Sequence, residues 1–190
     1  DVARRAGTLL VLDETTADLD IDRGPVDPGF VEEDADLVVR VGSLGKTVWG
    51  GLRVGWIRAA VPVLRRLVAA RPARDLGTPE FEQAVAARVL SQYPEVTAQR
   101  AELLRLGRDT VTAQITARLP QWRVPPVHGG VSLWVALDAP LSAALVMQAR
   151  AEGLLLSAGP RFSLDGGHER HLRVPFTADA ITLARAVDVL

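Results

Sequence analysis

The sequence contains no cysteine, which excludes disulfide bonds and thiolate metal sites. It has no apolar run of the length needed to span a bilayer, and its charged first residues, DVARR, do not form a signal peptide. Its formal net charge is only −1, so this chain gives no reason to expect direct binding to nucleic acid or to a membrane surface. These absences favour a protein of a reducing, cytoplasmic compartment.

The chain is long and apolar enough to fold. Its 190 residues, 48% of them hydrophobic, can bury one large core or two small ones, and no long polar tract indicates disorder. Only about seven residues precede the first apolar strand pattern, at residues 8–12. So abrupt a start leads us to expect that the chain is cut from a longer protein.

Polar side chains follow two short apolar runs that read as strands. Asp13 follows residues 8–12, a run expected to be buried on both faces, and Ser43 follows residues 37–41. The carboxyl ends of parallel strands meet at one sheet edge, where ligands collect, so both side chains could face one site. Gly24-Pro25 and Pro28-Gly29 predict turns between the strands. Asp13 has an alternative interpretation, as a loop or cap carboxylate.

The segment 39–58, VRVGSLGKTVWGGLRVGWIR, gathers the side chains that hold phosphate. Ser43, Lys46 and Arg53 are potential phosphate ligands, and the glycines between them permit close approach of a ligand to the backbone. A desolvated lysine can also form a Schiff base with a carbonyl. We interpret the segment as a cofactor cradle; the alternatives are a surface lysine, a turn serine and a solvated arginine.

Nucleotide-binding motifs do not fit this segment. A P-loop requires a glycine five residues before Gly45, where Arg40 stands, and the residues after Thr47 make a poor helix start. The dinucleotide fingerprint GxGxxG does not occur. The set that remains is a carboxylate, a lysine and phosphate-binding cations, which is what a pyridine cofactor acting as an electron sink needs.

The rest of the chain divides into two kinds of pattern. Helices are predicted at about 59–71, 78–92 and 95–119, the last ended by Pro120. After it, strands are predicted at 122–127, 131–137, 154–156, 161–164 and 171–176, with a helix at 140–152 and a last helix capped by Thr177. We therefore predict an α/β domain over 1–92, a linking helix over 93–120 and a smaller α+β domain over 121–190.

Several segments together resemble one family. They are VLDETTADL, GSLGKTVWGGLRVGWIRA, GGVSLWVAL, GPRFS and HLRVPF, and they extend over essentially the whole chain. These segments resemble the sequences of fold-type I, class I/II pyridoxal-phosphate-dependent aminotransferases, and more closely those of the aminotransferase-like domain of GntR/MocR-type transcriptional regulators. The resemblance implies an α/β fold: the second half of the large domain, with a mostly parallel sheet, followed by a smaller α+β C-terminal domain.

The resemblance also implies a cofactor and its residues. The cofactor is pyridoxal 5'-phosphate, with Lys46 as the lysine that forms the internal aldimine and Asp13 as the partner of the pyridinium nitrogen. Ser43 and Arg53 match phosphate ligands. Arg173, in LRVPF, matches the arginine that grips a substrate or effector carboxylate, a role that suits a planar guanidinium. An arginine on an edge strand is the alternative interpretation of that residue.

Two departures from the family pattern affect the functional expectation. Thr16 stands where the family usually has a tyrosine that bonds the cofactor ring, which puts full turnover in question. The family's preceding sequence is absent from this chain. The preferred parent is a MocR-type regulator that binds DNA through an upstream domain and senses an amino acid or amine carrying a carboxylate. A working aminotransferase and a remnant that holds no cofactor are the alternatives; a homodimer is implied for the complete protein.

Other notable side chains receive structural interpretations. Trp49 and His128 are assigned to packing or loop structure. His168 and His171 could suggest a metal site, but they have no cysteine or acidic partner at ligand spacing, so a solvated loop is preferred.

Overall fold

A computed structural model describes residues 2–22 and 36–190 of the chain. The described residues form two compact units, Asp1–Arg100 and Ala101–Leu190. The turns predicted at Gly24-Pro25 and Pro28-Gly29 lie outside the described residues. No helix in the described part of the chain is long and apolar enough to cross a membrane.

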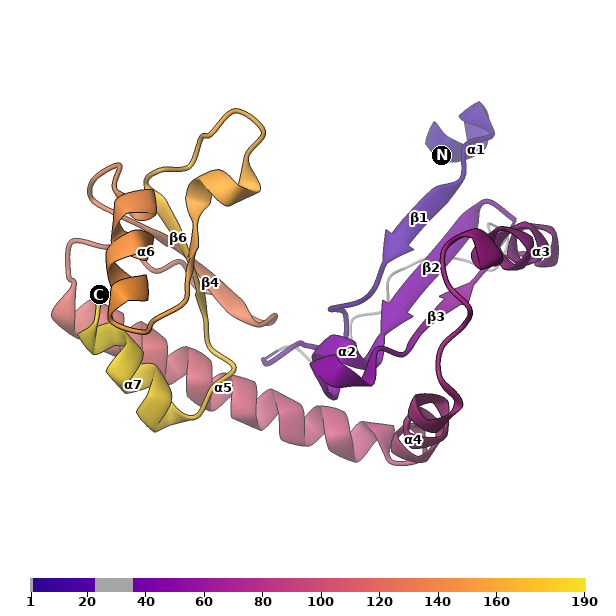
Figure 1. The fold of residues 1–190 in the computed structure, drawn as a ribbon, viewed down its shortest axis with the longest axis horizontal. Helices are drawn as coiled ribbons and strands as arrows, with labels where there is room; N and C mark the ends of the chain where they lie inside the picture. The colour runs from indigo at the N-terminus through magenta and orange to yellow at the C-terminus, as the bar shows by residue number, and fades with distance from the viewer. Residues whose placement is uncertain (1, 23–35) are drawn as a thin grey trace. The chain divides into compact units, whose positions relative to one another are not determined.

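The first unit contains a three-stranded sheet in the order β1-β2-β3 (Figure 1). β1 (Leu10–Asp13) pairs in parallel with β2 (Val38–Ser43), and β2 pairs in antiparallel fashion with β3 (Gly55–Arg58). In this register Asp13 lies opposite Val41. Because β1 and β2 run in the same direction, their carboxyl ends share one edge, which confirms the arrangement predicted for Asp13 and Ser43.

Short helices complete the first unit. They are α1 (Val2–Ala6), α2 (Leu44–Thr47), η2 (Gly50–Leu52), α3 (Val61–Ala70), η3 (Arg71–Ala73) and α4 (Glu80–Leu90). A small core forms where α2 and η2 meet α4, around the buried Leu44, Leu52 and Ala86. Four side chains pack partly buried against it: Val48, Val54, Val85 and Tyr93. This core holds α2, the short helix that carries Lys46.

The sheet of the first unit is more exposed than the sequence predicts. Val11 of β1 is 63% exposed, and all four residues of β3 are exposed, so the prediction that residues 8–12 are buried on both faces is wrong. Two features account for the difference. β1 is an edge strand of a sheet with only three described strands, and α3 contributes no fully buried side chain.

A single helix, α5 (Tyr93–Arg118), contributes residues to both units. The pair Tyr93-Pro94, interpreted from the sequence as a break, instead starts this helix. Proline is tolerated there because the first-turn N–H groups have no intrahelical partner in any case. The helix ends at Arg118, just before Pro120.

The second unit is built on an antiparallel sheet in the order β4-β6-β5. Its elements are β4 (Ser132–Ala136), α6 (Ser142–Ala151), β5 (Ser157–Ala158), η4 (Gly159–Phe162), β6 (His171–Pro175) and α7 (Ala180–Asp188). β4 and β6 alternate strictly between buried and half-buried positions. One face of the sheet therefore faces the core, where Val135, Leu172 and Phe176 are fully buried.

Several predicted elements of the second unit are wrong. Residues 122–127 make only one isolated bridge, Arg123 to Ala136, because the prolines at 125 and 126 lack the N–H groups a strand needs. Residues 161–164 are not a strand: Gly159–Phe162 form the 3₁₀ turn η4. The strand expected at 154–156 occurs instead at Ser157–Ala158. The cap of α7 is Asp179, which accepts a hydrogen bond from the Thr182 N–H at 2.9 Å, and not Thr177.

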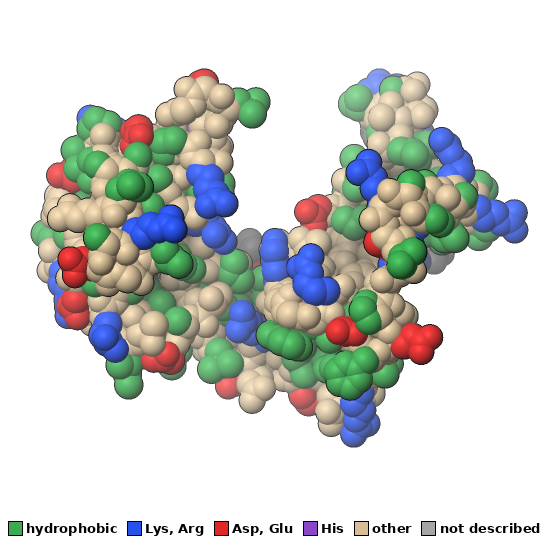
Figure 2. Space-filling model, in the orientation of Figure 1, with side chains coloured by type: hydrophobic (Ala, Val, Ile, Leu, Met, Phe, Trp, Pro, Cys, Tyr) green, Lys and Arg blue, Asp and Glu red, His purple; other side chains and the backbone are tan. Residues whose placement is uncertain are grey.

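Charges on the surface are mixed. On the face drawn in Figure 2, Lys and Arg side chains are interspersed with acidic and apolar ones. This distribution agrees with the net charge of −1.

Candidate functional site

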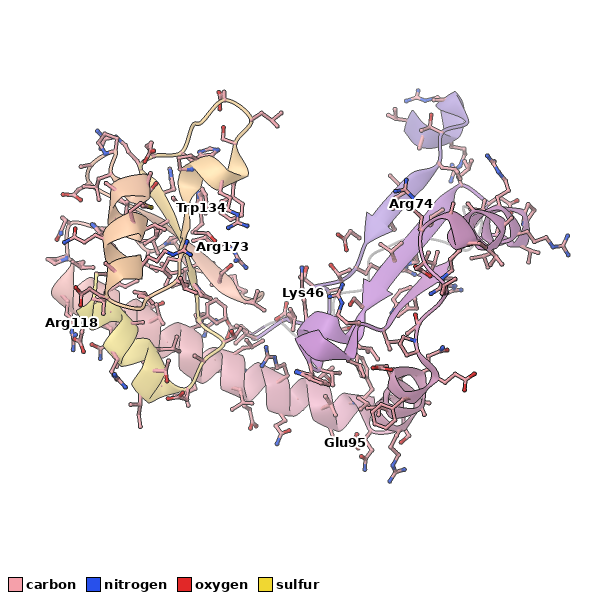
Figure 3. All side chains as sticks on the ribbon, in the orientation of Figure 1. Lys46, Arg74, Glu95, Arg118, Trp134 and Arg173 are labelled. Carbon is pink, nitrogen blue, oxygen red and sulfur yellow. The ribbon has the colours of Figure 1, made fainter. Side chains whose placement is uncertain are left out.

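Lys46 lies on α2, which begins directly where β2 ends. Ser43 caps this helix: its Oγ accepts a hydrogen bond from the Gly45 N–H at 3.0 Å. Leu44 and Thr47 are buried on the same short helix and anchor it, whereas Lys46 is exposed. Figure 3 shows the Lys46 side chain projecting from α2 near the ends of the first sheet's strands.

Lys46 is the only lysine in the sequence; the other 21 of its 22 basic residues are arginines. An arginine stays charged in proteins and does not serve as an amine nucleophile, whereas a lysine can lose its proton and attack a carbonyl. The one side-chain amine of the chain therefore stands at the carboxyl edge of the sheet.

Asp13 stands in an environment that favours its ionised form. The Thr15 hydroxyl, followed by the Thr15 backbone N–H at 3.0 Å, holds the pKa of Asp13 below its usual value against the opposing effect of desolvation. The positive charge of Lys46 lowers the Asp13 pKa further. Asp13 is exposed, so it can serve as the counter-charge of a cationic ring.

An ion pair beside Asp13 escaped the sequence analysis. Arg40 of β2 donates from Nε and Nη2 to Glu14 Oε1 at 2.9 and 2.6 Å, and both side chains are partly buried. The Glu14 N–H also donates to the Val41 carbonyl at 2.8 Å, which extends the β1–β2 pairing by one residue. The chain is thus fixed immediately after Asp13. A strand-end acid and a strand-interior arginine are each unremarkable alone, and only the parallel register brings them together.

Arg53 adopts a backbone conformation that is rare for a side-chain-bearing residue. Its φ of 52° and ψ of 24° place it in the left-handed region, at the end of η2. Leu52, buried at 2% exposure, anchors the turn, while Arg53 itself is exposed. Unusual backbone conformations of this kind concentrate at ligand-binding positions.

Two glycines of this segment, Gly51 and Gly55, lie against the protein's own atoms. A Cβ on Gly51 would lie 2.3 Å from the Trp49 ring, and one on Gly55 would lie 2.7 Å from the Gly42 carbonyl oxygen. The space beside these two glycines is therefore filled by the protein's own atoms. Trp49, although 66% exposed, lies over Gly51, in agreement with its assignment to packing.

Thr16 lies exposed in the loop that follows Asp13. The only tyrosine of the sequence, Tyr93, contacts the same loop from the start of α5, where it donates to Asp18. In the sequence, the dipeptide Tyr93-Pro94 indicated only a break between two helices. That Tyr93 is the sole tyrosine of the chain is the one signal in the sequence that could have identified it.

Arg173 belongs to the second unit, on the half-buried face of β6. Its Nε donates to Ser132 Oγ at 3.0 Å, which fixes one edge of the guanidinium, and Trp134 is its direct partner across the strands. Figure 3 shows Trp134 and Arg173 side by side on this sheet. Among the described residues, this hydrogen bond engages Nε and leaves the terminal nitrogens, which are the edge that binds a carboxylate in bidentate fashion.

An aromatic cluster surrounds Trp134. The His171 ring stacks on it at 5.2 Å, and Phe162 and His168 contact it edge to face at 5.4 and 5.7 Å. His171 therefore lies in strand β6 and packs, which corrects the expectation of a solvated loop; His168 is exposed. Within the described ranges, no group of three or more His, Cys, Asp or Glu side chains could hold a metal ion.

The structure thus gathers four of the five candidate residues in the first unit. Asp13 and Ser43 end neighbouring parallel strands, Lys46 follows Ser43 on α2, and Arg53 precedes Val54, whose carbonyl accepts from the Leu44 N–H at 3.0 Å. Arg173 is in the second unit. Chemically, the first unit offers an amine, an ionised carboxylate, a hydroxyl and a guanidinium, and the second offers a further guanidinium.

Sequence relatives fall into two groups. The chain is 27% identical to "Uncharacterized HTH-type transcriptional regulator YdfD" of Bacillus subtilis, over 84% of this chain and 34% of that protein. It is 31% identical to the 2-aminoadipate transaminase of Thermus thermophilus, over 79% of this chain and 39% of that protein. The chain spans less than half the length of either relative. No family model matches it.

Solved structures show the fold. The chain superimposes on LysN, the alpha-aminoadipate aminotransferase of Thermus thermophilus, with a TM-score of 0.87 at 24% identity. The match covers 99% of this chain and 50% of LysN, whose structure contains N-(5'-phosphopyridoxyl)-L-leucine. The chain is therefore similar to class I/II aminotransferases and to GntR/MocR-type regulators, and it has the fold of half an aminotransferase.

Proposed function

We propose that this chain is the pyridoxal-phosphate-binding, effector-sensing part of a cytoplasmic MocR-type transcriptional regulator. The observation that carries the proposal is the placement of the only lysine, at the carboxyl edge of the sheet and within the electrostatic influence of Asp13. The residues present fit the cofactor: two phosphate-binding groups, one amine and one carboxylate held ionised.

Each residue has a distinct part. Ser43 and Arg53 would hold the phosphate, and the left-handed backbone of Arg53 sets the direction from which its side chain leaves the turn. Lys46 supplies the amine that bonds the aldehyde carbon. Asp13, ionised at neutral pH, would keep a proton on the ring nitrogen. The bound cofactor supplies an electron sink for the bonds of an attached amine.

The effector would be an amino acid or amine that carries a carboxylate. Arg173 is the proposed carboxylate site, because Ser132 fixes the guanidinium by its Nε edge and leaves the bidentate edge available. DNA binding is assigned to an upstream domain of the complete protein, since this chain has a net charge of −1. A homodimer is proposed for the complete protein.

A working aminotransferase is the second candidate. The ionised Asp13 and the exposed Lys46 favour it, since an enzyme needs the first to sustain the electron sink and the second to move the α-proton. Thr16 argues for the regulator, because a threonine is too short to replace the phenol that the family uses on the cofactor ring. Relatives of both kinds match this chain.

The first test uses the single lysine. The full protein is incubated with pyridoxal phosphate and reduced with borohydride, and its peptides are analysed by mass spectrometry. We expect the pyridoxyl group on the peptide containing Lys46 and none on the same peptide of Lys46→Arg, which retains the charge without the nucleophile. Equal labelling of this peptide in the two proteins would overturn the assignment of Lys46.

A second test separates regulator from enzyme. Amino acids are added to the cofactor-loaded protein while the absorbance and the keto-acid product are followed together. A regulator gives a spectral shift with a changed affinity for its DNA and at most one equivalent of product. Continuous product formation with a keto-acid acceptor would favour the aminotransferase.

A further inference from the structure

Tyr93 connects three parts of the first unit through its hydroxyl. The group donates a hydrogen bond of 2.6 Å to Asp18 Oδ2, 75 residues earlier in the chain, and the Thr47 side chain lies close enough to lower the pKa of the phenol. Asp18 lies in the loop that follows Asp13, and Thr47 directly follows Lys46 on α2. Tyr93 is itself the first residue of α5.

The direction of these hydrogen bonds follows from the groups involved. A carboxylate can only accept, so the single phenol proton goes to Asp18, and the Thr47 hydroxyl, which lowers the pKa of Tyr93, can only donate toward the phenol oxygen. Thr47 is 2% exposed, so water does not readily replace the phenol as its partner. The burial and the neighbouring Asp18 raise the pKa of Tyr93 to about 12, so the phenol stays neutral and keeps donating at physiological pH.

The ring is fixed as well as the hydroxyl. Tyr93 packs against the small core of Leu44, Leu52 and Ala86, the core that anchors α2 and the turn before Arg53. The hydroxyl therefore projects from a packed ring onto both segments, the loop that contains Asp18 and the helix that contains Thr47. The loop directly follows Asp13, and the helix carries Lys46; these two residues are the proposed cofactor contacts.

We propose that Tyr93 is a positioning residue of the cofactor site: it holds the Lys46 helix at a fixed spacing from the loop after Asp13. The inference rests on the proposed function for its purpose, while the linkage it describes exists in the protein without cofactor. Loss of the hydroxyl releases both segments together, because one group ties both.

Hydrogen exchange measured on the full chain without cofactor tests the linkage. In Tyr93→Phe the ring stays in the core while the hydrogen bond to Asp18 and the contact of the hydroxyl with Thr47 are lost. We expect amide exchange to accelerate about tenfold, the size of one hydrogen bond to a charged group, in both segments 14–19 and 44–49. Helix α6 of the second unit should exchange at an unchanged rate, which excludes general destabilisation.

A matched control exists one turn along the same helix. The Thr97 hydroxyl bonds the carbonyls of Tyr93 and Pro94 at 3.0 and 2.9 Å, so Thr97→Val weakens the start of α5 without touching Asp18 or Thr47. We expect this variant to leave both segments unchanged. Equal acceleration in the two variants would overturn the inference, since the start of α5 alone would then explain the effect. Acceleration in neither would also overturn it.

Titration with pyridoxal phosphate tests whether Tyr93 affects cofactor affinity. Tyr93→Phe should weaken the affinity about tenfold, and Asp18→Asn, which keeps an acceptor for the phenol, should retain affinity better than Asp18→Ala. If the wild-type protein binds no cofactor, the proposed function fails while the exchange result still decides the linkage. If the wild type and Tyr93→Phe bind equally, the positioning role fails and the proposed function stands.

Discussion

The two units of this chain differ in how they bury their sheets. In the second unit, β4 and β6 alternate between buried and half-buried residues, and the core side chains Val135, Leu172 and Phe176 are completely buried. In the first unit, β3 is exposed along its whole length and α3 buries no residue. A parallel pair such as β1–β2 normally needs cover on both faces. The comparison shows that the second unit buries one face of its sheet, whereas the first unit has only the small core around α2 and leaves its sheet largely exposed.

The largest expected effect is on independent folding. We expect residues 93–190, expressed alone, to unfold cooperatively in urea, because the sheet, α6, α7 and most of α5 bury a core within this segment. Residues 1–92 alone should show no cooperative transition. Circular dichroism and tryptophan fluorescence measure both. A cooperative transition of the 1–92 segment would contradict the comparison.

A substitution at Gly107 should disrupt the packing of the second unit. A Cβ there would stand 2.0 Å from the Phe176 carbonyl oxygen, a backbone atom that cannot rotate away. We expect Gly107→Ala to destabilise the segment by about 3 kcal/mol, despite the better helix propensity of alanine. Thr116→Ala, at an exposed position of the same helix, is the control and should change stability by about 0.5 kcal/mol or less. Equal stability of the two variants would show that the helix does not pack closely at Gly107 against Phe176, the residue after β6.

The features that the sequence predicts well are those set by local patterns. The β1 and β2 runs, the shared edge of Asp13 and Ser43, and the long helix follow from local patterns, since apolar periodicity and prolines act over a few residues. The fold class follows from segments distributed along the chain, and structural superposition confirms it.

What the sequence could not predict depends on distant residues. The exposure of Val11 depends on which elements cover β1, and the apolar run alone cannot show that. The 122–127 and 161–164 strands failed because prolines and a 3₁₀ turn outweighed the apolar pattern. The supporting contacts of the site, Glu14–Arg40 and Ser132–Arg173, join residues 26 and 41 positions apart, so only the strand registers reveal them.

The hydrogen bond from Arg173 Nε to Ser132 Oγ leads us to expect two effects of different size on carboxylate binding. Arg173→Lys keeps the charge but loses the bidentate geometry, and should weaken an amino acid's affinity for the cofactor-loaded protein by more than about tenfold. Ser132→Ala removes only the hydroxyl that fixes Nε and should cost about threefold. Spectral titration measures both. The matching amine without a carboxylate is the control, and its affinity should not change; a parallel loss would refute the role of Arg173.

The smallest effect concerns the ionisation of Tyr93, the only tyrosine, which ultraviolet absorbance of tyrosinate reports without interference from a second phenol. Burial, the largest cause, and Asp18 raise its pKa from 10.0 to about 12. A raised pKa means that the neutral phenol stabilises the folded state fully below pH 10, and that this contribution is lost as the pH rises from about 10 to about 12.

Two comparisons sharpen that titration. Asp18→Asn removes the charge but leaves the burial, so the midpoint should fall and still remain above 10.0, whereas in urea the same tyrosine should titrate at its ordinary value. Unfolding at high pH must be monitored in parallel by tryptophan fluorescence. A folded wild-type protein whose tyrosine titrates near 10.0 would show that the phenol is not held by Asp18, and that α5 contacts the loop after Asp13 less firmly than this hydrogen bond indicates.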